Sequence, residues 1–257
     1  MEEHSADLEQ RIAVVTGASR GIGAAIAERL ATDGCHVVLC ARSKDVLDDA
    51  AARLRERGLA ASALACDLAD RESVLGLVRS VRDRFGRVDV LVNNAGVLPK
   101  AELAVQVTPE AWDAVLDVNL TAPFLLAAGL RPLMPAGSVV VTVTSTAAYY
   151  PSKGLVAYNV SKAALVMLTR VLALEWARDG IRVVGIAPGK IDTEMMAPIS
   201  AWAASRGMAL NPQNRMGEAD EVGALVSFVV SDSARYLTGV TVPLDGGELL
   251  AYGGGGG

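Results

Sequence analysis

Residues 12–23 read IAVVTGASRGIG, and this stretch decides the fold. Its first four residues are apolar and mostly β-branched, as expected for a buried parallel strand. Glycines follow at 17, 21 and 23, and Ala24 to Ala31 is typical of a helix. A glycine-rich turn between a strand and a helix lets backbone N–H groups approach a pyrophosphate closely. The sequence therefore favours nucleotide binding here over an ordinary tight turn.

Strand-like and helix-like segments alternate along the rest of the chain, which indicates parallel βαβ units with helices on both faces of a sheet. The expected strands are 12–15, 36–40, 61–65, 88–92, 138–143, 181–187 and 240–244. The expected helices are 24–31, 45–57, 71–85, one from Pro109, 158–178 and 218–230. Neither a repeat nor a linker interrupts this order, so we predict a single domain over residues 1–257.

Two segments depart from the alternation. Residues at about 193–214 show no clean period, which fits either a substrate lid over the sheet edge or a plain surface excursion. The glycines at 253–257 form a low-complexity run that predicts a disordered tail.

Composition narrows the function classes. The chain is 51% hydrophobic and 21% charged, typical of a globular protein, and its net charge of −5 disfavours nucleic acid and anionic membranes as partners. The apolar runs look too short to span a bilayer, and the acidic N-terminus is unlike a secretory signal. Three cysteines without a CxxC pair indicate buried thiols in a reducing cytoplasm. The chain has only two histidines, which disfavours a His-based metal site or a Ser-His-Asp triad.

Tyr158 and Lys162 lie four residues apart, so in a helix they share one face. A free phenol titrates near pH ~10, and a nearby ammonium group lowers that pKa toward the range useful for acid/base catalysis. Ser145, at the end of an apolar strand, could supply a second hydroxyl. Such tyrosine-lysine pairs also occur on many solvated helices, so the surroundings have to decide.

Residues after the second and third expected strands bear on the cofactor. A carboxylate after the second strand suits the ribose of NAD, whereas Arg42 stands there and suits a 2′-phosphate. Arg20, inside the glycine turn, could reach the same corner. We therefore favour NADP(H) over NAD. Asp67, just past the third strand, either meets adenine or caps the next helix.

Amide side chains mark two further positions. The segment 93–96 reads NNAG at the end of a strand, which suits a ligand lying across the sheet edge. Asn119 interrupts an apolar helix face, and a buried amide needs partners. It is either structural or part of a polar site.

Taken together, TGASRGIG at 16–23, NNAG at 93–96, Ser145, YxxxK at 158–162 and Pro188-Gly189 resemble the classical short-chain dehydrogenase/reductase family. The resemblance runs from about Leu8 to Gly247 and is closest to the 3-oxoacyl-carrier-protein-reductase type. It implies one doubly wound Rossmann-type α/β domain with a seven-stranded parallel sheet, assembled as a homotetramer or homodimer.

The resemblance also implies roles. Tyr158 would be the general acid in carbonyl reduction, Lys162 its pKa partner and ribose ligand, Ser145 the partner of the carbonyl oxygen, and Asn119 the holder of a water that links Lys162 to solvent. The implied NADP(H) site comprises Gly17, Ser19, Arg20, Gly21, Ile22, Gly23, Arg42, Asp67, Leu68, Asn94, Ala95, Gly96, Tyr158, Lys162, Pro188, Gly189, Ile191 and Thr193.

The substrate side is the least determined. Ser145, Tyr150, Lys190 and Met195 are candidate substrate residues. Lys190 departs from the apolar or aromatic residue usual in the family, so it would attract an anionic substrate if it faces the pocket, and otherwise it faces solvent. We predict an NADP(H)-dependent ketone reductase for a small carbonyl or alcohol substrate, a class that includes carrier-linked and CoA-linked carbonyls. The alternatives are an NAD-dependent alcohol dehydrogenase of the same family and a catalytically silent nucleotide-binding scaffold.

Overall fold

The computed structural model describes residues 10–197, 205–206 and 211–253 of the chain. Of the predicted lid at about 193–214, residues 198–204 and 207–210 lie outside the described residues. The same holds for residues 254–257 of the predicted glycine tail.

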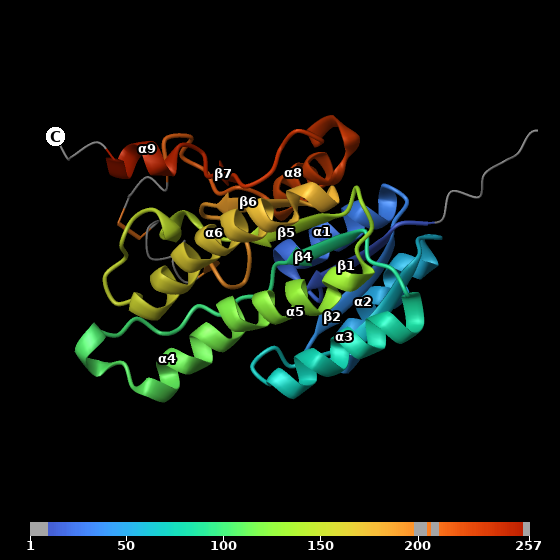
Figure 1. Ribbon diagram of the computed structural model, residues 1–257. Coiled ribbons are helices and arrows are strands. Elements are labelled where there is room, and N and C mark those ends of the chain that lie inside the picture. Colours follow the sequence, from blue (N-terminus) through green and yellow to red (C-terminus); the bar gives the residue numbers. More distant parts are fainter. Residues whose placement is uncertain (1–9, 198–204, 207–210, 254–257) are drawn as a thin grey trace, which may run out of the picture.

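One sheet forms the centre of the molecule. Its strands are β1 (Ile12–Thr16), β2 (His36–Ala41), β3 (Ala61–Ala65), β4 (Val90–Asn93), β5 (Val139–Val143), β6 (Arg182–Pro188) and β7 (Thr241–Leu244). All pair in parallel, in the order β3-β2-β1-β4-β5-β6-β7 (Figure 1). The predicted doubly wound fold with a seven-stranded parallel sheet is confirmed.

Helices cover both faces of the sheet. They are α1 (Gly21–Thr32), α2 (Lys44–Glu56), α3 (Arg71–Phe85), α4 (Pro109–Leu116), α5 (Ala122–Leu130), α6 (Val156–Trp176), α8 (Ala219–Val230) and the short α9 (Glu248–Gly253). Buried residues of α1, α2 and α8 pack on one face, and those of α3, α5 and α6 pack on the other. The sheet is thus the middle of three layers.

The two faces explain why the strands read as continuous apolar runs. Along β1, Ala13 and Val15 belong to the core cluster under α1, α2 and α8, whereas Val14 belongs to the cluster under α3, α5 and α6. A strand covered on both faces has no solvent side, so it gains free energy from apolar residues at every position.

Strand order places the functional segments together. The chain runs from β1 outward to β2 and β3, and then returns to β4 on the other side of β1. In open parallel sheets a ligand crevice forms outside the carboxyl ends of the strands where the order reverses in this way. The turns after β1, β4, β5 and β6 all leave from this edge, and they carry the motifs identified in the sequence.

The helix expected from Pro109 is interrupted. Between α4 and α5, residues Asp117–Thr121 form one π-helical turn, whose wider winding accommodates Asn119 inside the fold. Such turns occur often at functional sites. The helix expected from Tyr158 begins at Val156, so Tyr158 lies in its first turn.

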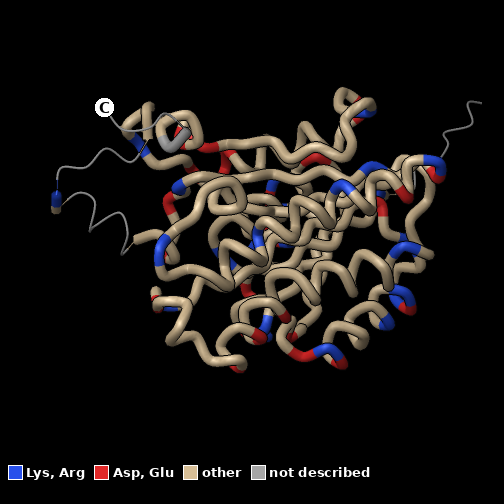
Figure 2. The backbone as a smooth tube through the Cα atoms, turned by 60° about the vertical axis from the view of Figure 1, so that its left-hand side comes forward, with Lys and Arg blue, Asp and Glu red and all other residues tan. Residues whose placement is uncertain are grey.

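Two helical stretches, Pro109–Leu133 and Val156–Asp179, are long and apolar enough, by length and composition, to cross a membrane. Both stretches contain charged residues, so they are apolar on average rather than uninterrupted apolar runs, and the expectation that the apolar runs are too short is not contradicted. Both pack against the sheet, and burial of one face in the core accounts for much of their apolar content. Along the outer helices, acidic and basic residues are interspersed (Figure 2).

Candidate active site

The glycine turn is shaped for close approach. Gly17 and Gly21 have φ of 65° and 56°, in the left-handed region that glycine tolerates best. A methyl group at Gly23 would lie 2.1 Å from the carbonyl oxygen of Gly17 and 2.5 Å from Nδ2 of Asn94. Among the described residues, no side chain caps the start of α1, and its first turn holds no acidic residue. These free N–H groups fit the pyrophosphate of a dinucleotide.

The ends of β1 and β4 are joined through Thr16. Its hydroxyl accepts hydrogen bonds from the backbone N–H groups of Asn94 (3.0 Å) and Ala95 (3.1 Å) and donates to the Val92 carbonyl (3.3 Å). The Asn94 side chain donates to the Thr16 carbonyl at 2.8 Å. Residues 94–96 therefore lie beside the glycine turn, as the predicted cofactor site requires. Sequence reasoning missed the part played by Thr16, although it opens the motif.

The two arginines of the cofactor prediction differ in their contacts. Arg42 is exposed directly after β2, where a 2′-phosphate would approach. Arg20 occupies the N-cap position of α1 without a capping hydrogen bond from its side chain, and its guanidinium pairs with Glu194 at 2.7 Å, with both side chains largely exposed. Arg20 therefore connects the glycine turn to the segment that follows β6.

Asp67 does not cap the next helix. The N-cap of α3 is Asp70, whose carboxylate accepts the N–H of Glu72 at 3.0 Å. Asp67 instead accepts the N–H of Ala69 at 3.1 Å in a local turn, and it is exposed. The capping alternative was wrong, and contact with adenine by Asp67 and the half-buried Leu68 stays a prediction.

Lys162 lies at the centre of the acid/base cluster. Its ammonium group is 5.7 Å from the ring centroid of Tyr158 and donates a hydrogen bond to the carbonyl of Val143, the last residue of β5, at 3.0 Å. Gly96 faces both predicted proton-path residues, because a methyl group there would lie 3.3 Å from Nζ of Lys162 and 3.4 Å from Oδ1 of Asn119. The structure thus brings the residues from three chain segments together.

The pKa values in this cluster depart from the sequence expectation. Burial raises the pKa of the Tyr158 phenol, and a hydrogen bond with Ser145 acts in the opposite direction. Burial also lowers the pKa of Lys162 to about 8. The expected depression of the tyrosine pKa by Lys162 is therefore not what this structure shows. Removal from water has the larger effect on both groups.

Asn119 is fully buried and firmly held. Its side-chain oxygen accepts the N–H of Val97 at 2.8 Å, and its amide nitrogen donates to the Val97 carbonyl and to the Ser161 hydroxyl, each at 3.1 Å. Ser161 lies between Tyr158 and Lys162 in the chain. The structural and the polar-site alternatives therefore describe one arrangement, in which Asn119 ties the loop after β4 to α6.

The loop that carries Ser145 is held from α6 by a residue that sequence reasoning missed. Asn159, next to Tyr158, donates to the carbonyls of Ala147 (2.6 Å) and Tyr150 (2.9 Å). The Ser145 hydroxyl oxygen accepts the N–H of Ala147 at 3.1 Å, which leaves its proton available to another acceptor. Asn159 was hidden in the sequence because it stands inside the YxxxK motif at an unspecified position.

The predicted nicotinamide residues follow β6. Pro188 ends this strand opposite Leu244 of β7, and Ile191 is buried and forms a bridge with Gly217. Thr193 lies over the glycine turn, since a methyl group at Gly21 would be 3.4 Å from its Cγ2. The segment after β6 therefore faces the turn from which the pyrophosphate would be held.

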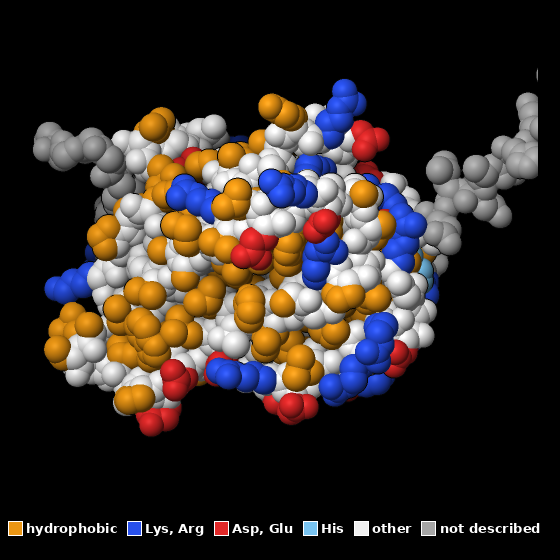
Figure 3. All heavy atoms as spheres, viewed as in Figure 1, with side chains coloured by type: hydrophobic (Ala, Val, Ile, Leu, Met, Phe, Trp, Pro, Cys, Tyr) orange, Lys and Arg blue, Asp and Glu red, His pale blue; other side chains and the backbone are white. Residues whose placement is uncertain are grey.

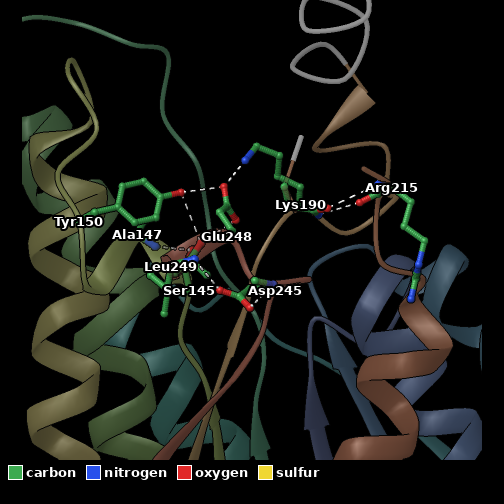
Figure 4. A network of polar contacts seen from close by, with 11 residues as sticks. Ser145, Ala147, Tyr150, Lys190, Arg215, Asp245, Glu248 and Leu249 are labelled. Carbon is green, nitrogen blue, oxygen red and sulfur yellow. Dashed lines mark hydrogen bonds and ion pairs between the residues drawn. The ribbon is translucent and has the colours of Figure 1, made fainter. Parts of the chain in front are cut away.

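The predicted substrate residues lie in different surroundings. Lys190 neither faces solvent nor stands free to attract an anion, because its ammonium pairs with the carboxylate of Glu248 (Figure 4). Tyr150 donates its hydroxyl proton to the same carboxylate at 3.0 Å. Met195 is 51% exposed at the start of the predicted lid. No sequence motif pointed to Glu248, which follows the last strand.

Comparisons with known proteins agree with this geometry. The family model for "Enoyl-(Acyl carrier protein) reductase" matches residues 17–248. Dehydrogenase/reductase SDR family member 4 of Oryctolagus cuniculus is 40% identical over 244 residues, 93% of this chain and 94% of the relative. D-threitol dehydrogenase of Mycolicibacterium smegmatis is 38% identical over 251 residues, 95% of this chain and 94% of the relative.

A solved structure extends the likeness to three dimensions. L-Sorbose reductase of Gluconobacter frateurii, complexed with NADPH and L-sorbose, matches with a TM-score of 0.87 and 36% identity over 93% of this chain and 97% of that one. Because the sequence and structural matches both cover more than nine tenths of the chain, it belongs to the short-chain dehydrogenase/reductase family and is an oxidoreductase that acts on CH–OH groups with NAD(P).

Proposed function

We propose that this chain is an NADP(H)-dependent carbonyl reductase in which Tyr158 donates the proton. The convergence of Lys162 and Asn119 beside Gly96, with the Tyr158 ring 5.7 Å from the Lys162 ammonium, carries the proposal, because a scaffold that only bound nucleotide would not need these residues together. The hydrogen bond between Ser145 and Tyr158 adds the second hydroxyl at the same place.

The chain's residues supply orientation and proton control. NADPH, when bound, supplies the hydride. Burial raises the pKa of the Tyr158 phenol, so the phenol holds the proton that a general acid would deliver to the substrate oxygen, and the hydrogen bond with Ser145 opposes this rise. Ser145 would donate a hydrogen bond to the substrate oxygen as negative charge develops there. Lys162 would contact the nicotinamide ribose and retain its own proton below a pKa of about 8.

Replacement of Tyr158 tests the reaction. Tyr158→Phe removes the proton donor and keeps the ring, so we expect kcat to fall about 10²–10⁴-fold, the range for a positioned general acid. NADPH oxidation would be followed over a panel of ketoses, simple ketones and acyl thioesters, with polyols in the reverse direction. Tyr236→Phe is the matched control, since Tyr236 is fully exposed. If no carbonyl is reduced, or if both variants behave alike, the proposal fails.

The choice of NADP(H) rests on Arg42. It stands exposed after β2, and the related L-sorbose reductase was solved with NADPH. Arg42→Ala should lower kcat/KM with NADPH about tenfold or more and change kcat/KM with NADH by less than about twofold, because NADH has no 2′-phosphate to contact. Arg53→Ala, an exposed arginine on α2, is the control. An equal loss with both cofactors would exclude this role.

We also propose that the chain assembles as a homotetramer or homodimer in the cytoplasm. Val160, Met167, Val171 and Leu174 form an exposed apolar stripe on α6, and Phe124 of α5 is half-exposed. Figure 3 shows hydrophobic side chains gathered on the side covered by α4, α5 and α6. Contiguous exposed apolar surface of this kind supports an interface.

The three cysteines are free and buried, which supports a reducing compartment.

A further inference from the structure

Glu248 is a buried carboxylate that the family motifs do not include. It opens α9 and its exposed fraction is 1%. Burial of a carboxylate is unfavourable unless charges and hydrogen bonds compensate it. Here Lys190 supplies the opposite charge, and Tyr150 donates at 3.0 Å to Oε1 (Figure 4). Thr146 donates at 3.3 Å to Oε2.

These partners come from two different loops of the candidate site. Thr146 directly follows Ser145, and Tyr150 lies in the same loop after β5. Lys190 directly follows Gly189 in the loop after β6. A methyl group at Gly189 would lie only 2.8 Å from Oε2 of Glu248, so the backbone of this second loop packs on the carboxylate as well. The Glu248 side chain therefore contacts both the loop that carries Ser145 and the loop predicted to orient the nicotinamide.

The carboxylate is presented from a fixed backbone. Asp245 accepts the N–H groups of Gly247 (2.9 Å) and Leu249 (2.8 Å), which closes the turn between β7 and α9. The Leu244 carbonyl accepts the N–H of Gly189 at 3.0 Å, so the loop after β6 is joined to the same turn. Glu248 thus has little freedom to follow a loop that moves.

We propose that Glu248 is a positioning residue for the reaction, which holds the Ser145–Tyr150 loop and the Pro188–Ile191 loop at the separation that hydride and proton transfer require. It acts through Thr146, Tyr150 and Lys190, and it contacts no reacting atom itself. The inference rests on the proposed reductase activity, because that activity gives the two loops their common task.

Glu248→Gln is the first test, because glutamine keeps the size and loses the charge. We expect kcat to fall about tenfold to a hundredfold, since small misplacement of reacting groups has effects of that order. The Kd for NADPH, measured by fluorescence titration, should change less than about threefold, because the glycine turn is untouched. A kcat within twofold of wild type, measured well below the Tm of the variant, would overturn the proposal.

A double variant separates positioning from simple loss of stability. The double variant Glu248→Gln/Lys190→Met removes both charges together. We therefore expect its kcat to be about threefold or more above the value obtained by multiplying the reductions in kcat of the two single variants. Strictly independent effects would count against a shared role. Glu28→Gln on α1 is the control, because it removes an ion pair with Arg57 at the end of α2 and reaches neither loop.

Hydrogen exchange provides a measurement that does not depend on turnover. Glu248→Gln should speed amide exchange in both 145–150 and 188–191 and leave the glycine turn unchanged. Faster exchange in one loop alone, or equally throughout the chain, would overturn the bridging role. If the wild type reduces no carbonyl, the proposed function fails, and the exchange pattern still decides whether Glu248 holds the two loops together.

Discussion

At the scale of the residue, Lys162 is held where its charge is disfavoured. Burial lowers the pKa of its ammonium group from 10.5 to about 8, and the Val143 carbonyl accepts a hydrogen bond from it. The unfolded chain keeps the ordinary pKa, so between about pH 8 and 10.5 the unfolded state binds more protons than the folded state. Stability due to this group therefore rises with pH across that window, and the unfavourable contribution is fully present below it.

Replacement of Lys162 should reveal this linkage. Between pH 7 and pH 9, we expect the free energy of unfolding of wild type to rise by about 1 kcal/mol relative to Lys162→Met. The comparison removes contributions that both proteins share, such as the raised pKa of Cys40. Urea unfolding at the two pH values provides the measurement. Parallel pH profiles would mean that the folded-state pKa of Lys162 is not lowered.

At this scale the sequence predicted positions better than energies. Spacing placed Tyr158 and Lys162 on one helix face, and the structure agrees. The direction of the tyrosine pKa shift depended on burial, which the spacing does not encode. Glu248 was missed for a related reason. Its partners lie 58 to 102 residues away in the chain, so only the folded arrangement reveals what it contacts.

At the scale of the element, the two aspartates before α3 have separate tasks. Asp70→Ala removes the N-cap and should destabilise the protein by about 1 kcal/mol in urea unfolding, with little change in the Kd for NADPH. Asp67→Ala should weaken NADPH binding and leave stability nearly unchanged, if Asp67 meets adenine. The paired variants, measured in both assays, would contradict this division if Asp67→Ala destabilised as much as Asp70→Ala.

The elements themselves were largely predictable, because parallel strands covered on both faces leave continuous apolar runs and glycines mark their turns. The π-helical turn at Asp117–Thr121 was not predictable. It coincides with the hydrogen bonds of Asn119 to Val97 and Ser161, and such tertiary contacts are not encoded in local helix propensity. The boundary of α6 shifted by two residues, from Tyr158 to Val156.

At the scale of the whole molecule, the apolar stripe on α6 stands out among the described residues as apolar surface that no other element of the fold covers. Leu174 is 82% exposed and Met167 55% exposed, and both lie on the outer side of the helix. We expect Met167→Glu/Leu174→Glu to dissociate the proposed oligomer in light scattering and to leave the far-UV circular dichroism of the fold intact, because a buried unpaired charge is unfavourable at an interface. Arg170→Glu, on the same helix, tests for an effect of charge alone.

Fold and assembly differ in how much sequence determines them. The order of strands follows from alternating segments and the handedness of parallel crossovers, which leave few arrangements. The subunit arrangement depends on surfaces that composition does not locate. The apolar stripe emerges only when the buried side of α6 has been assigned to the sheet.

The buried pair of Lys190 and Glu248 also limits how this enzyme can be recombined with its relatives. The two residues belong to segments that a chimera would normally treat as independent pieces, the loop after β6 and the helix after β7. A hybrid that takes one piece from this chain and the other from a relative with an apolar residue would separate the charges. A chimera is therefore expected to fold and remain active when both segments come from the same parent protein.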